Sequence, residues 1–362
     1  MKVVFRVDSS HSIGTGHVMR CMVLADALRE KGYSVFFLCR DLPGNHIFAL
    51  KDKNFCVITL PFNSQEQEAL KVLPEHQQWL GTTIQKDCEV TLFQLSLLGN
   101  IDWLVIDHYA LDNTWETACK AFAKKIMVID DLADRQHICN LLLDQNYYSN
   151  PEKRYNTRLP HDCKTLIGPQ FALLRSEFEE IRKKIFPYDG KVKRLMVSLG
   201  GCDPDNVTRK VLEGIAGSNC YDLEVDVVLG ATSQHKVDIQ KWCNQRKNYH
   251  FHSPSHNMAE LIKNADLAIG AGGISTWERC CLGLPSLVVS IANNQDKLIS
   301  EACSANAIDY LGNIHDLDVP TIARKLNELV NNPQKLQFMR QIGMSLVDGL
   351  GTKRVVNTIL SL

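Results

Sequence analysis

Near its N-terminus the chain reads Lys2-Val-Val-Phe-Arg-Val-Asp8-Ser-Ser-His-Ser-Ile-Gly14-Thr-Gly16-His17-Val-Met-Arg20-Cys21, and this stretch decides the fold. The apolar run before Asp8 is typical of a buried strand. A helix is expected after it, because apolar residues recur there at helical spacing, namely Val18, Cys21, Met22, Ala25 and Leu28. In an open parallel sheet, ligands bind at the carboxyl end of the first strand, and a helix N-terminus there attracts an anion. The stretch therefore predicts the first strand–helix unit of a doubly wound sheet, with a ligand site at the Gly14–Gly16 turn.

His17 lies in the first turn of this predicted helix. The positive end of the helix dipole disfavours a second positive charge, so the imidazole is biased towards its neutral form, which can act as a general base. Asp8 could orient His17, and Arg20 could pair with a phosphate, although either could form structural bonds instead. The alternative for the whole motif is a tight turn that leaves His17 on the surface.

A nicotinamide-binding site is a weaker interpretation of the same turn. The dinucleotide fingerprint needs a third glycine at position 19, where Met19 stands. Asp41 does lie at a plausible distance along the chain for a ribose contact, so an oxidoreductase stays a distant alternative.

The composition is that of an ordinary globular protein with about two domains. The 362 residues are 45% hydrophobic and 22% charged with a formal net charge of -1, which favours neither a nucleic-acid nor an anionic-membrane partner. No apolar stretch reaches bilayer length, and the N-terminal segment does not resemble a signal peptide. The 13 cysteines include no C-x-x-C pair, which indicates reduced thiols rather than a zinc site. We therefore expect a cytoplasmic protein without a metal ion and without a membrane partner.

Strand-like and helix-like segments alternate along nearly the whole chain, which indicates parallel sheets covered by helices on both faces. The strands expected in the first half are Val3–Val7, Val35–Cys39, Phe55–Leu60, Trp103–Asp107, Ile126–Asp130 and Cys139–Leu143. Those expected in the second half are Arg194–Leu199, Leu223–Leu229, His250–His252, Leu267–Gly270, Leu287–Ser290 and Ile308–Tyr310. A helix is expected at Asn113–Ala123, and two helices with a break near Gly349–Gly351 at the end of the chain.

Proline, glycine and charged residues cluster at 185–191 and indicate a linker between domains. We expect an N-terminal Rossmann-like domain at 1–187, a C-terminal Rossmann-like domain at 188–345, and a C-terminal helix within 346–362 that packs back on the first domain. The polar stretch Asn63–Gln94 is expected to form an inserted helical lid or a longer helix and loop, and its function cannot be inferred from the sequence. Two doubly wound domains imply a ligand cleft between them.

Two glycine-rich turns follow strands of the second half. Gly200 and Gly201 follow Leu199 and would let backbone N–H groups approach an anion, with a plain strand–helix turn as the alternative. Gly272 and Gly273 form the second turn, which resembles a phosphate cradle because a helix start follows it.

Hydroxyl and carboxylate groups follow this second turn. Ser275 and Thr276 supply hydroxyl donors, and Glu278 could accept hydrogen bonds from vicinal ribose hydroxyls or simply stabilise the helix dipole. Asn294 and Gln295 place amides after another strand, where a sugar would need neutral hydrogen-bond partners, although such residues also commonly form turns.

These motifs resemble those of the UDP-2,4-diacetamido-2,4,6-trideoxy-β-L-altropyranose hydrolases of pseudaminic acid biosynthesis, over nearly the whole chain. The segments that carry the resemblance are Arg6–Asp8, Ile13–Cys21, Asp107–Tyr109, Ile129–Arg135, Gly168–Arg175, Ser198–Gly201, Gly272-Gly273 with Glu278, and Asn294-Gln295. The resemblance implies an α/β fold of two doubly wound Rossmann-like domains that face each other across a cleft, as in glycosyltransferases of the B type.

The resemblance also implies the roles of the residues. His17 would activate water, and Tyr109 and Asn294 would hold the sugar. UDP would lie against the C-terminal domain, at the turns that contain Gly272, Gly273, Ser275, Thr276 and Glu278. The expected partners are thus a UDP-sugar and water, with no cofactor, and a monomer suffices.

The chemistry fits these roles. Water activated by one base would displace UDP from the anomeric carbon with inversion, and the phosphate needs no general acid to leave. A glycosyltransferase with a carbohydrate or lipid acceptor is the main alternative, because the fold alone does not separate the two activities. A nucleotide-sugar-binding module without turnover is another alternative, but binding alone would not need a base beside the sugar.

Overall fold

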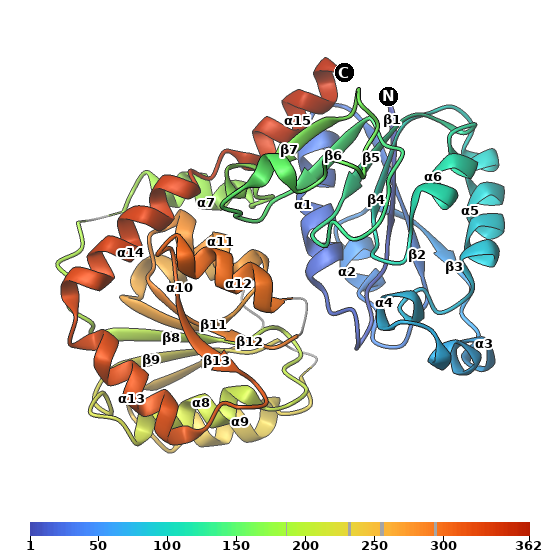
Figure 1. Cartoon of the computed structure of the whole chain (residues 1–362). Coiled ribbons are helices and arrows are strands. Elements are labelled where there is room, and N and C mark those ends of the chain that lie inside the picture. Colours follow the sequence, from blue (N-terminus) through green and yellow to red (C-terminus); the bar gives the residue numbers. More distant parts are fainter. Residues whose placement is uncertain (186, 231–232, 254–256, 293–294) are drawn as a thin grey trace. The chain divides into compact units, whose positions relative to one another are not determined.

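Figure 1 shows the computed structural model, which describes residues 1–185, 187–230, 233–253, 257–292 and 295–362. The chain forms two compact units. Unit 1 comprises residues 1–146, 150–173 and 352–362, and unit 2 comprises residues 147–149 and 174–351. This division is one of packing, so the domain boundaries at 187 and 345 stay predictions.

Unit 1 is a seven-stranded parallel sheet in the order β3-β2-β1-β4-β5-β6-β7, covered by helices. Its strands are β1 (Lys2–Val7), β2 (Ser34–Arg40), β3 (Cys56–Leu60), β4 (Ile101–Asp107), β5 (Ala123–Ile129), β6 (Leu141–Asp144) and β7 (Lys164–Ile167). Its helices are α1 (Gly16–Glu30), α2 (Ile47–Asp52), α3 (Ser64–Ala69), α4 (Glu75–Gln78), α5 (Ile84–Leu98), α6 (Asn113–Cys119) and α15 (Gly351–Ser361), with short 3-10 turns at Leu70–Val72, Pro151–Lys153 and Pro169–Phe171.

Unit 2 is a six-stranded parallel sheet in the order β10-β9-β8-β11-β12-β13. Its strands are β8 (Arg194–Ser198), β9 (Glu224–Val228), β10 (Tyr249–His252), β11 (Leu267–Ala271), β12 (Ser286–Ser290) and β13 (Asp309–Asn313). Its helices are α7 (Ser176–Arg182), α8 (Val207–Ala216), α9 (Lys236–Asn244), α10 (Met258–Asn264), α11 (Ile274–Cys281), α12 (Gln295–Ser304), α13 (Val319–Val330) and α14 (Pro333–Leu346).

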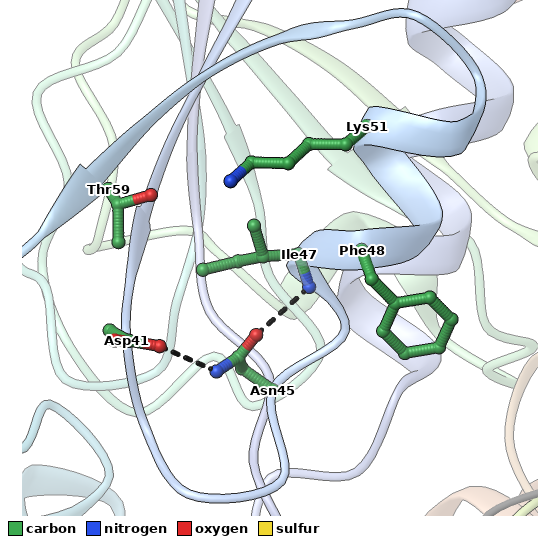
Figure 2. Close-up of a pocket in the computed structure, with 6 residues that line it drawn as sticks. All are labelled: Asp41, Asn45, Ile47, Phe48, Lys51 and Thr59. Carbon is green, nitrogen blue, oxygen red and sulfur yellow. Dashed lines mark hydrogen bonds between the residues drawn. The ribbon is translucent and has the colours of Figure 1, made fainter.

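A pocket of about 420 Å³ lies in unit 1 beside α2. Figure 2 shows its lining, which comprises Asp41, Asn45, Ile47, Phe48, Lys51 and Thr59. The Asn45 side chain links two residues of this lining. Its amide nitrogen donates to Asp41 at 2.9 Å, and its amide oxygen accepts from the backbone N–H of Ile47 at 3.1 Å. Asp41 is thus bonded within this pocket, which includes none of the residues predicted to bind substrate.

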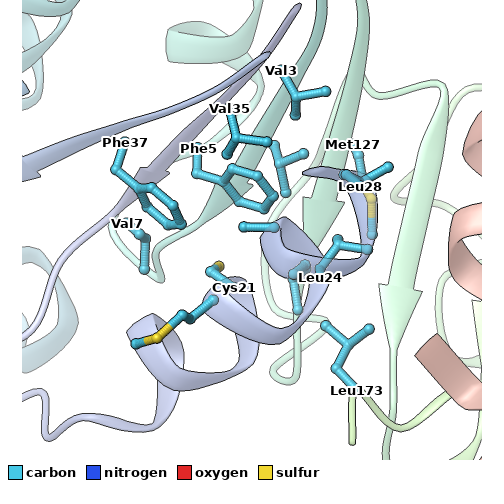
Figure 3. Close-up of a cluster of buried hydrophobic side chains, with 14 of the residues drawn as sticks. Val3, Phe5, Val7, Cys21, Leu24, Leu28, Val35, Phe37, Met127 and Leu173 are labelled. Carbon is cyan, nitrogen blue, oxygen red and sulfur yellow. The ribbon is translucent and has the colours of Figure 1, made fainter. Parts of the chain in front are cut away.

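The core of unit 1 follows the alternation of side chains along β1. Val3, Phe5 and Val7 point to the face covered by α1, where the Phe5 ring stacks on Phe37 with ring centroids 4.9 Å apart (Figure 3). The C-terminal helix α15 adds Val355, Val356 and Ile359 to this same cluster. The opposite face packs against α5 and α6, and this face receives both Val4 and the charged side chain of Arg6.

The buried Arg6 is matched by a carboxylate from α5. Asp87 is fully buried and accepts hydrogen bonds from Arg6 Nη2 and Arg40 Nη2, both at 2.6 Å, and from Trp115 Nε1 at 3.0 Å. Burial alone would raise the pKa of Asp87, but Arg6 and Arg40 outweigh it and lower the pKa to about 2. Asp87 therefore holds α5 against the ends of β1 and β2 through buried ion pairs with Arg6 and Arg40.

Every strand expected from the sequence overlaps an observed strand, and α14 and α15 confirm the two C-terminal helices. Strand β7 was not expected. The helix predicted at Asn113–Ala123 was too long, because α6 ends at Cys119 and Ala123 already begins β5. No helix in the described part of the chain combines the length and apolar character needed to cross a membrane.

We predict that Asp87→Asn destabilises the protein by about 3–5 kcal/mol, because it leaves two buried guanidinium groups without their shared carboxylate. Urea unfolding of the variant measures this loss. The control is Glu89→Gln, an exposed position on the same helix, which should leave the unfolding midpoint unchanged. Equal midpoints for the two variants would show that the Asp87 pairs do not hold α5.

Candidate active site

The strand order reverses beside the first strand of each sheet. β1 lies between β2 and β4 in unit 1, and β8 lies between β9 and β11 in unit 2. Such a switch point is where open parallel sheets bind ligands, beyond the carboxyl ends of the strands. The residues predicted for each unit follow these strands: Asp8, Gly14, Gly16 and His17 follow β1, Tyr109 follows β4, Gly200 and Gly201 follow β8, and Gly272 and Gly273 follow β11.

The turn between β1 and α1 leaves open space beside its glycines. Gly14 has a φ of +76°, in the left-handed region that favours glycine, and accounts for the first of the two glycines in the motif. A Cβ atom added at Gly14 or Gly16 would meet no other atom within 4 Å. The backbone of the turn is therefore accessible to a ligand on the side where side chains are lacking.

His17 is oriented by Asp107, the last residue of β4. Its Nδ1 lies 2.6 Å from Asp107 Oδ1, and because a carboxylate only accepts hydrogen bonds, Nδ1 is the donor. None of the hydrogen bonds among the described residues uses Nε2, and a tenth of the His17 side chain is exposed. In the neutral ring this tautomer has its lone pair on Nε2, the arrangement that a general base needs.

Arg20 completes the group around Asp107. Its Nε and Nη2 donate to the two oxygens of Asp107 at 2.6 and 2.7 Å, and its Nη1 donates to Asp131 at 2.6 Å. Burial alone would raise the pKa of Asp107, but Arg20 and His17 hold it well below its usual range. Asp107 is therefore ionised at neutral pH and can stabilise a positive charge that develops on His17. Arg20 is committed to two carboxylates, so its predicted pairing with a phosphate has no support in unit 1.

Tyr109 joins the same network. Its hydroxyl donates to Asp131 at 2.7 Å, and its ring meets the edge of His17 with centroids 4.7 Å apart. Burial and the neighbouring Asp131 carboxylate raise the pKa of Tyr109. The phenol is thus a fixed neutral group next to the candidate base.

Asp8 does not orient His17. Its Oδ1 accepts from Arg6 Nη1 and from the backbone N–H of Arg40, both at 2.7 Å, and its Oδ2 lies 3.4 Å from His108 Nε2. The expectation for Asp8 is corrected on geometry, because Asp107 occupies the position beside His17 and Asp8 links β1 to β2. No local pattern in the sequence indicates that His17 pairs with Asp107, because the two residues lie far apart along the chain.

The turns of unit 2 have the backbone that an anion site requires. Gly200 has a φ of +99° and Gly273 a φ of +91°, so both need glycine, and Cβ atoms at Gly201 or Gly273 would meet nothing within 4 Å. A Cβ atom at Gly272 would come within 2.9 Å of the Ile299 side chain. Gly272 thus allows close packing against α12, whereas Gly273 leaves the N-terminus of α11 open for a ligand.

Arg279 is a site residue that the sequence analysis missed. It is 2% exposed, and none of the ion pairs in the described part of the chain includes it. Its guanidinium donates to the hydroxyls of Ser275 and Thr276, each at 3.2 Å, to the carbonyl of Ala271 at 2.9 Å and to Ser286 Oγ at 2.9 Å. Burial lowers the pKa of Arg279 to about 10, so it stays protonated at neutral pH. Among the described residues, a cation without a carboxylate partner therefore lies against the two hydroxyls of the predicted phosphate cradle.

The remaining predicted residues of unit 2 lie around this cradle. Ser198 ends β8, and Glu278 lies on α11 with 18% of its side chain exposed, 3.8 Å from Arg175. Burial raises the pKa of Glu278, and Arg175 opposes the shift. Gln295 starts α12, and its Oε1 accepts from the backbone of Ile291 at 3.3 Å. Asn294 lies outside the described residues.

The comparisons with known proteins bear on the family and the fold of this chain. Residues 198–348 match the glycosyltransferase family 28 C-terminal domain. A protein of Methanocaldococcus jannaschii described as uncharacterized is 25% identical over 299 residues, which are 80% of this chain and 55% of that protein, so the chain spans about half of it. The spore coat polysaccharide biosynthesis protein SpsG of Bacillus subtilis is 25% identical over 360 residues, 98% of this chain and 96% of its own length.

Two further likenesses bear on the predicted family and fold. The UDP-2,4-diacetamido-2,4,6-trideoxy-beta-L-altropyranose hydrolase of Campylobacter jejuni is 25% identical over 302 residues, 82% of this chain and 94% of its own length. The crystal structure of Acinetobacter baumannii MurG superposes with a TM-score of 0.67 at 14% identity and covers 100% of both chains. These findings confirm the predicted resemblance and the glycosyltransferase-B-like fold class, and they place the chain among enzymes.

His108 gives the site a predicted dependence of stability on pH. Burial lowers its pKa from 6.5 to about 4, against the attraction of Asp8. Between these two values the unfolded chain binds a proton that the folded chain excludes, so stability is complete above pH 6.5 and falls as the pH drops towards 4. The full difference corresponds to on the order of 3 kcal/mol.

We expect His108→Gln to flatten the plot of unfolding free energy against pH in this window, and the exposed His11→Gln to leave its slope unchanged. If the unmodified chain, His108→Gln and His11→Gln all showed the same slope, the lowered pKa of His108 would not be the cause of the pH dependence.

Proposed function

We propose that this chain hydrolyses UDP-2,4-diacetamido-2,4,6-trideoxy-β-L-altropyranose to the free sugar and UDP, as a step of pseudaminic acid biosynthesis. The observation that carries the proposal is the His17–Asp107 pair at the switch point of unit 1, in which Nε2 of His17 has no hydrogen bond to any described residue. The name of the Campylobacter jejuni relative supports this choice of substrate.

The base acts on water. In the proposed reaction His17 Nε2 accepts a proton from a water molecule as the water oxygen attacks the anomeric carbon. The imidazolium that forms is stabilised by Asp107, which Arg20 keeps ionised. Tyr109 and Asn294 are proposed to hold the sugar. Because one nucleophile replaces one leaving group, the anomeric configuration is inverted.

Unit 2 is proposed to bind the nucleotide. The N–H groups at Gly200, Gly201 and Gly273 and the N-terminus of α11 would bind the diphosphate, with Ser198 and the amide of Gln295 beside them. The hydroxyls of Ser275 and Thr276, fixed by Arg279, are proposed to contact the same oxygens. Glu278 is proposed to accept hydrogen bonds from the ribose. The charge on departing UDP would thus be stabilised by backbone dipoles and one buried cation.

A glycosyltransferase is the second candidate, because residues 198–348 match a domain of glycosyltransferase family 28. The same base could activate an acceptor hydroxyl instead of water. The two functions differ in one respect that can be measured, which is the release of UDP when no acceptor is present.

The test is an incubation of the protein with the UDP-diacetamido sugar in oxygen-18 water, with a chelator and without an acceptor. UDP release with the label on the sugar is the expected result. Label in UDP would mean that water attacks phosphorus, which contradicts the mechanism. Tight UDP binding without UDP release would favour the transferase.

We predict that His17→Asn lowers kcat by roughly 100-fold or more, because general-base catalysis contributes about that much. The affinity for UDP, measured by titration calorimetry, should not change, since the proposed nucleotide site lies in unit 2. The half-buried His46 of unit 1 provides the control, and His46→Asn should keep normal turnover. Near-normal turnover of His17→Asn would rule out His17 as the base.

We also predict that Arg279→Met weakens UDP binding by roughly tenfold, about 1.4 kcal/mol, because the variant removes the charge and releases the two hydroxyls. Titration calorimetry with UDP measures the change. The matched control is Arg324→Met, since Arg324 of the same unit has 58% of its side chain exposed. Unchanged UDP affinity in Arg279→Met, with the fold intact by circular dichroism, would remove Arg279 from the nucleotide site.

A further inference from the structure

The stretch from Asn63 to Gln94 contributes two aromatic side chains to the His17 site. His76 belongs to the short helix α4, and Trp79 follows its end. The Trp79 ring stacks on Tyr109 with centroids 5.6 Å apart and an interplanar angle of 29°. The His76 ring contacts Trp79 at 4.7 Å and Tyr109 at 5.1 Å, also measured between centroids. His17 meets Tyr109 at 4.7 Å, so the four rings form one continuous cluster.

This segment is anchored firmly enough to hold the cluster. Leu70 and Leu80 are buried, and Leu80 is part of the core on the α5 side of the sheet. Gly81 has a φ of +67°, and a Cβ atom there would come within 2.5 Å of the Leu42 side chain, so the chain turns tightly next to Trp79. Thr82 Oγ1 donates to Glu66 of α3 at 2.9 Å, which ties together the two sides of the part that contains His76 and Trp79. His76 and Trp79 thus have a fixed position beside Tyr109.

The two rings are only partly covered. His76 and Trp79 are both intermediate in exposure, whereas Tyr109 is 7% exposed. Burial lowers the pKa of His76, which favours its neutral, less polar form. Trp79 Nε1 is itself buried, so the exposed part of the ring contributes an apolar surface. Uncovered aromatic surface next to a candidate base is suited to a ligand with apolar groups.

We propose that His76 and Trp79 form the wall of the sugar subsite and select sugars whose substituents end in methyl groups. This inference rests on the proposed function and extends it to the recognition of the sugar. A water molecule activated by His17 must lie within about 3 Å of Nε2, and the anomeric carbon within about 3.5 Å of that water. The sugar ring therefore lies beside His17, within reach of the adjoining aromatic cluster.

The methyl groups supply the selectivity. A 2,4-diacetamido-2,4,6-trideoxy hexose carries two acetamido methyls and a methyl at carbon 6, whereas an ordinary hexose carries a hydroxymethyl group there. An apolar pocket discriminates by roughly 10–200-fold for each methyl or methylene that it covers. Trp79 and His76 are specificity-determining residues in this scheme, while the base remains His17.

Trp79→Ala, Trp79→Phe and the control Phe93→Ala test the proposal. Phe93 lies on α5 in the same segment and is 60% exposed, outside the cluster. With the UDP-diacetamido sugar, Trp79→Ala should raise KM by roughly tenfold or more, whereas Trp79→Phe should recover most of the loss. With UDP-N-acetylglucosamine, the ratio of kcat/KM values should shift in favour of this less apolar sugar. UDP affinity should stay constant in every variant, and Phe93→Ala should behave as the unmodified chain.

An unchanged KM in a folded Trp79→Ala variant would overturn the proposal, and so would an equal loss with both sugars. Saturation-transfer NMR separates this inference from the proposed function, because it needs binding and not turnover. If the unmodified chain releases no UDP, the proposed function fails, but the proposal that His76 and Trp79 contact the sugar can still be tested. Saturation of the sugar methyl protons that disappears in Trp79→Ala and persists in Phe93→Ala would then support the wall. Equal saturation in the two variants, or none in the unmodified chain, would refute it.

Discussion

The carboxylate of Asp107 is the point on which the arrangement of unit 1 depends. It ends β4 and binds the first two turns of α1 through His17, Arg20 and the thiol of Cys21. Because the Asp107 side chain is fully buried, its charge is tolerated only while these donors surround it. The same contacts that dock α1 on the sheet therefore fix the tautomer of His17, so the fold of unit 1 and its candidate base are set by one interaction.

The two units differ in how the buried charges at their switch points are paired. At the switch point of unit 1, the guanidinium of Arg20 is shared between Asp107 and Asp131, so this cation is already paired with two carboxylates. At the switch point of unit 2, Arg279 is buried and forms no ion pair with any described residue, and its donors go to hydroxyls and a carbonyl instead. A neutral sugar and water suit the first environment, and an anion suits the second. This asymmetry is the reason that we propose the base and the sugar for unit 1 and the nucleotide for unit 2.

The sequence was sufficient where the signal is local. Buried parallel strands are continuous apolar runs, and glycines with positive φ lie where their motifs predicted, as Gly14, Gly200 and Gly273 show. Strand β7 was not predicted because Lys164–Ile167 is a short edge strand with half of its residues exposed. Asp107 was not predicted to orient His17, because only the pairing of β1 with β4 brings residue 107 to it, and Asp8 forms the structural bonds that were the alternative. Arg279 and Asp87 were missed for a related reason, since a charged residue in a helix is ordinarily on the surface and its burial depends on tertiary packing.

The covering of His17 bears on the choice between water and a larger nucleophile. A tenth of its side chain is exposed, and its ring lies against Tyr109, which contacts Trp79 and His76 in turn. A base needs only to be within about 3 Å of the proton that it removes, so the small exposed part of His17 suffices for water. The fold itself can support both hydrolysis and transfer. The features of unit 1 that fit the proposed hydrolysis are therefore the ionised carboxylate that orients His17 and the limited exposure of its ring.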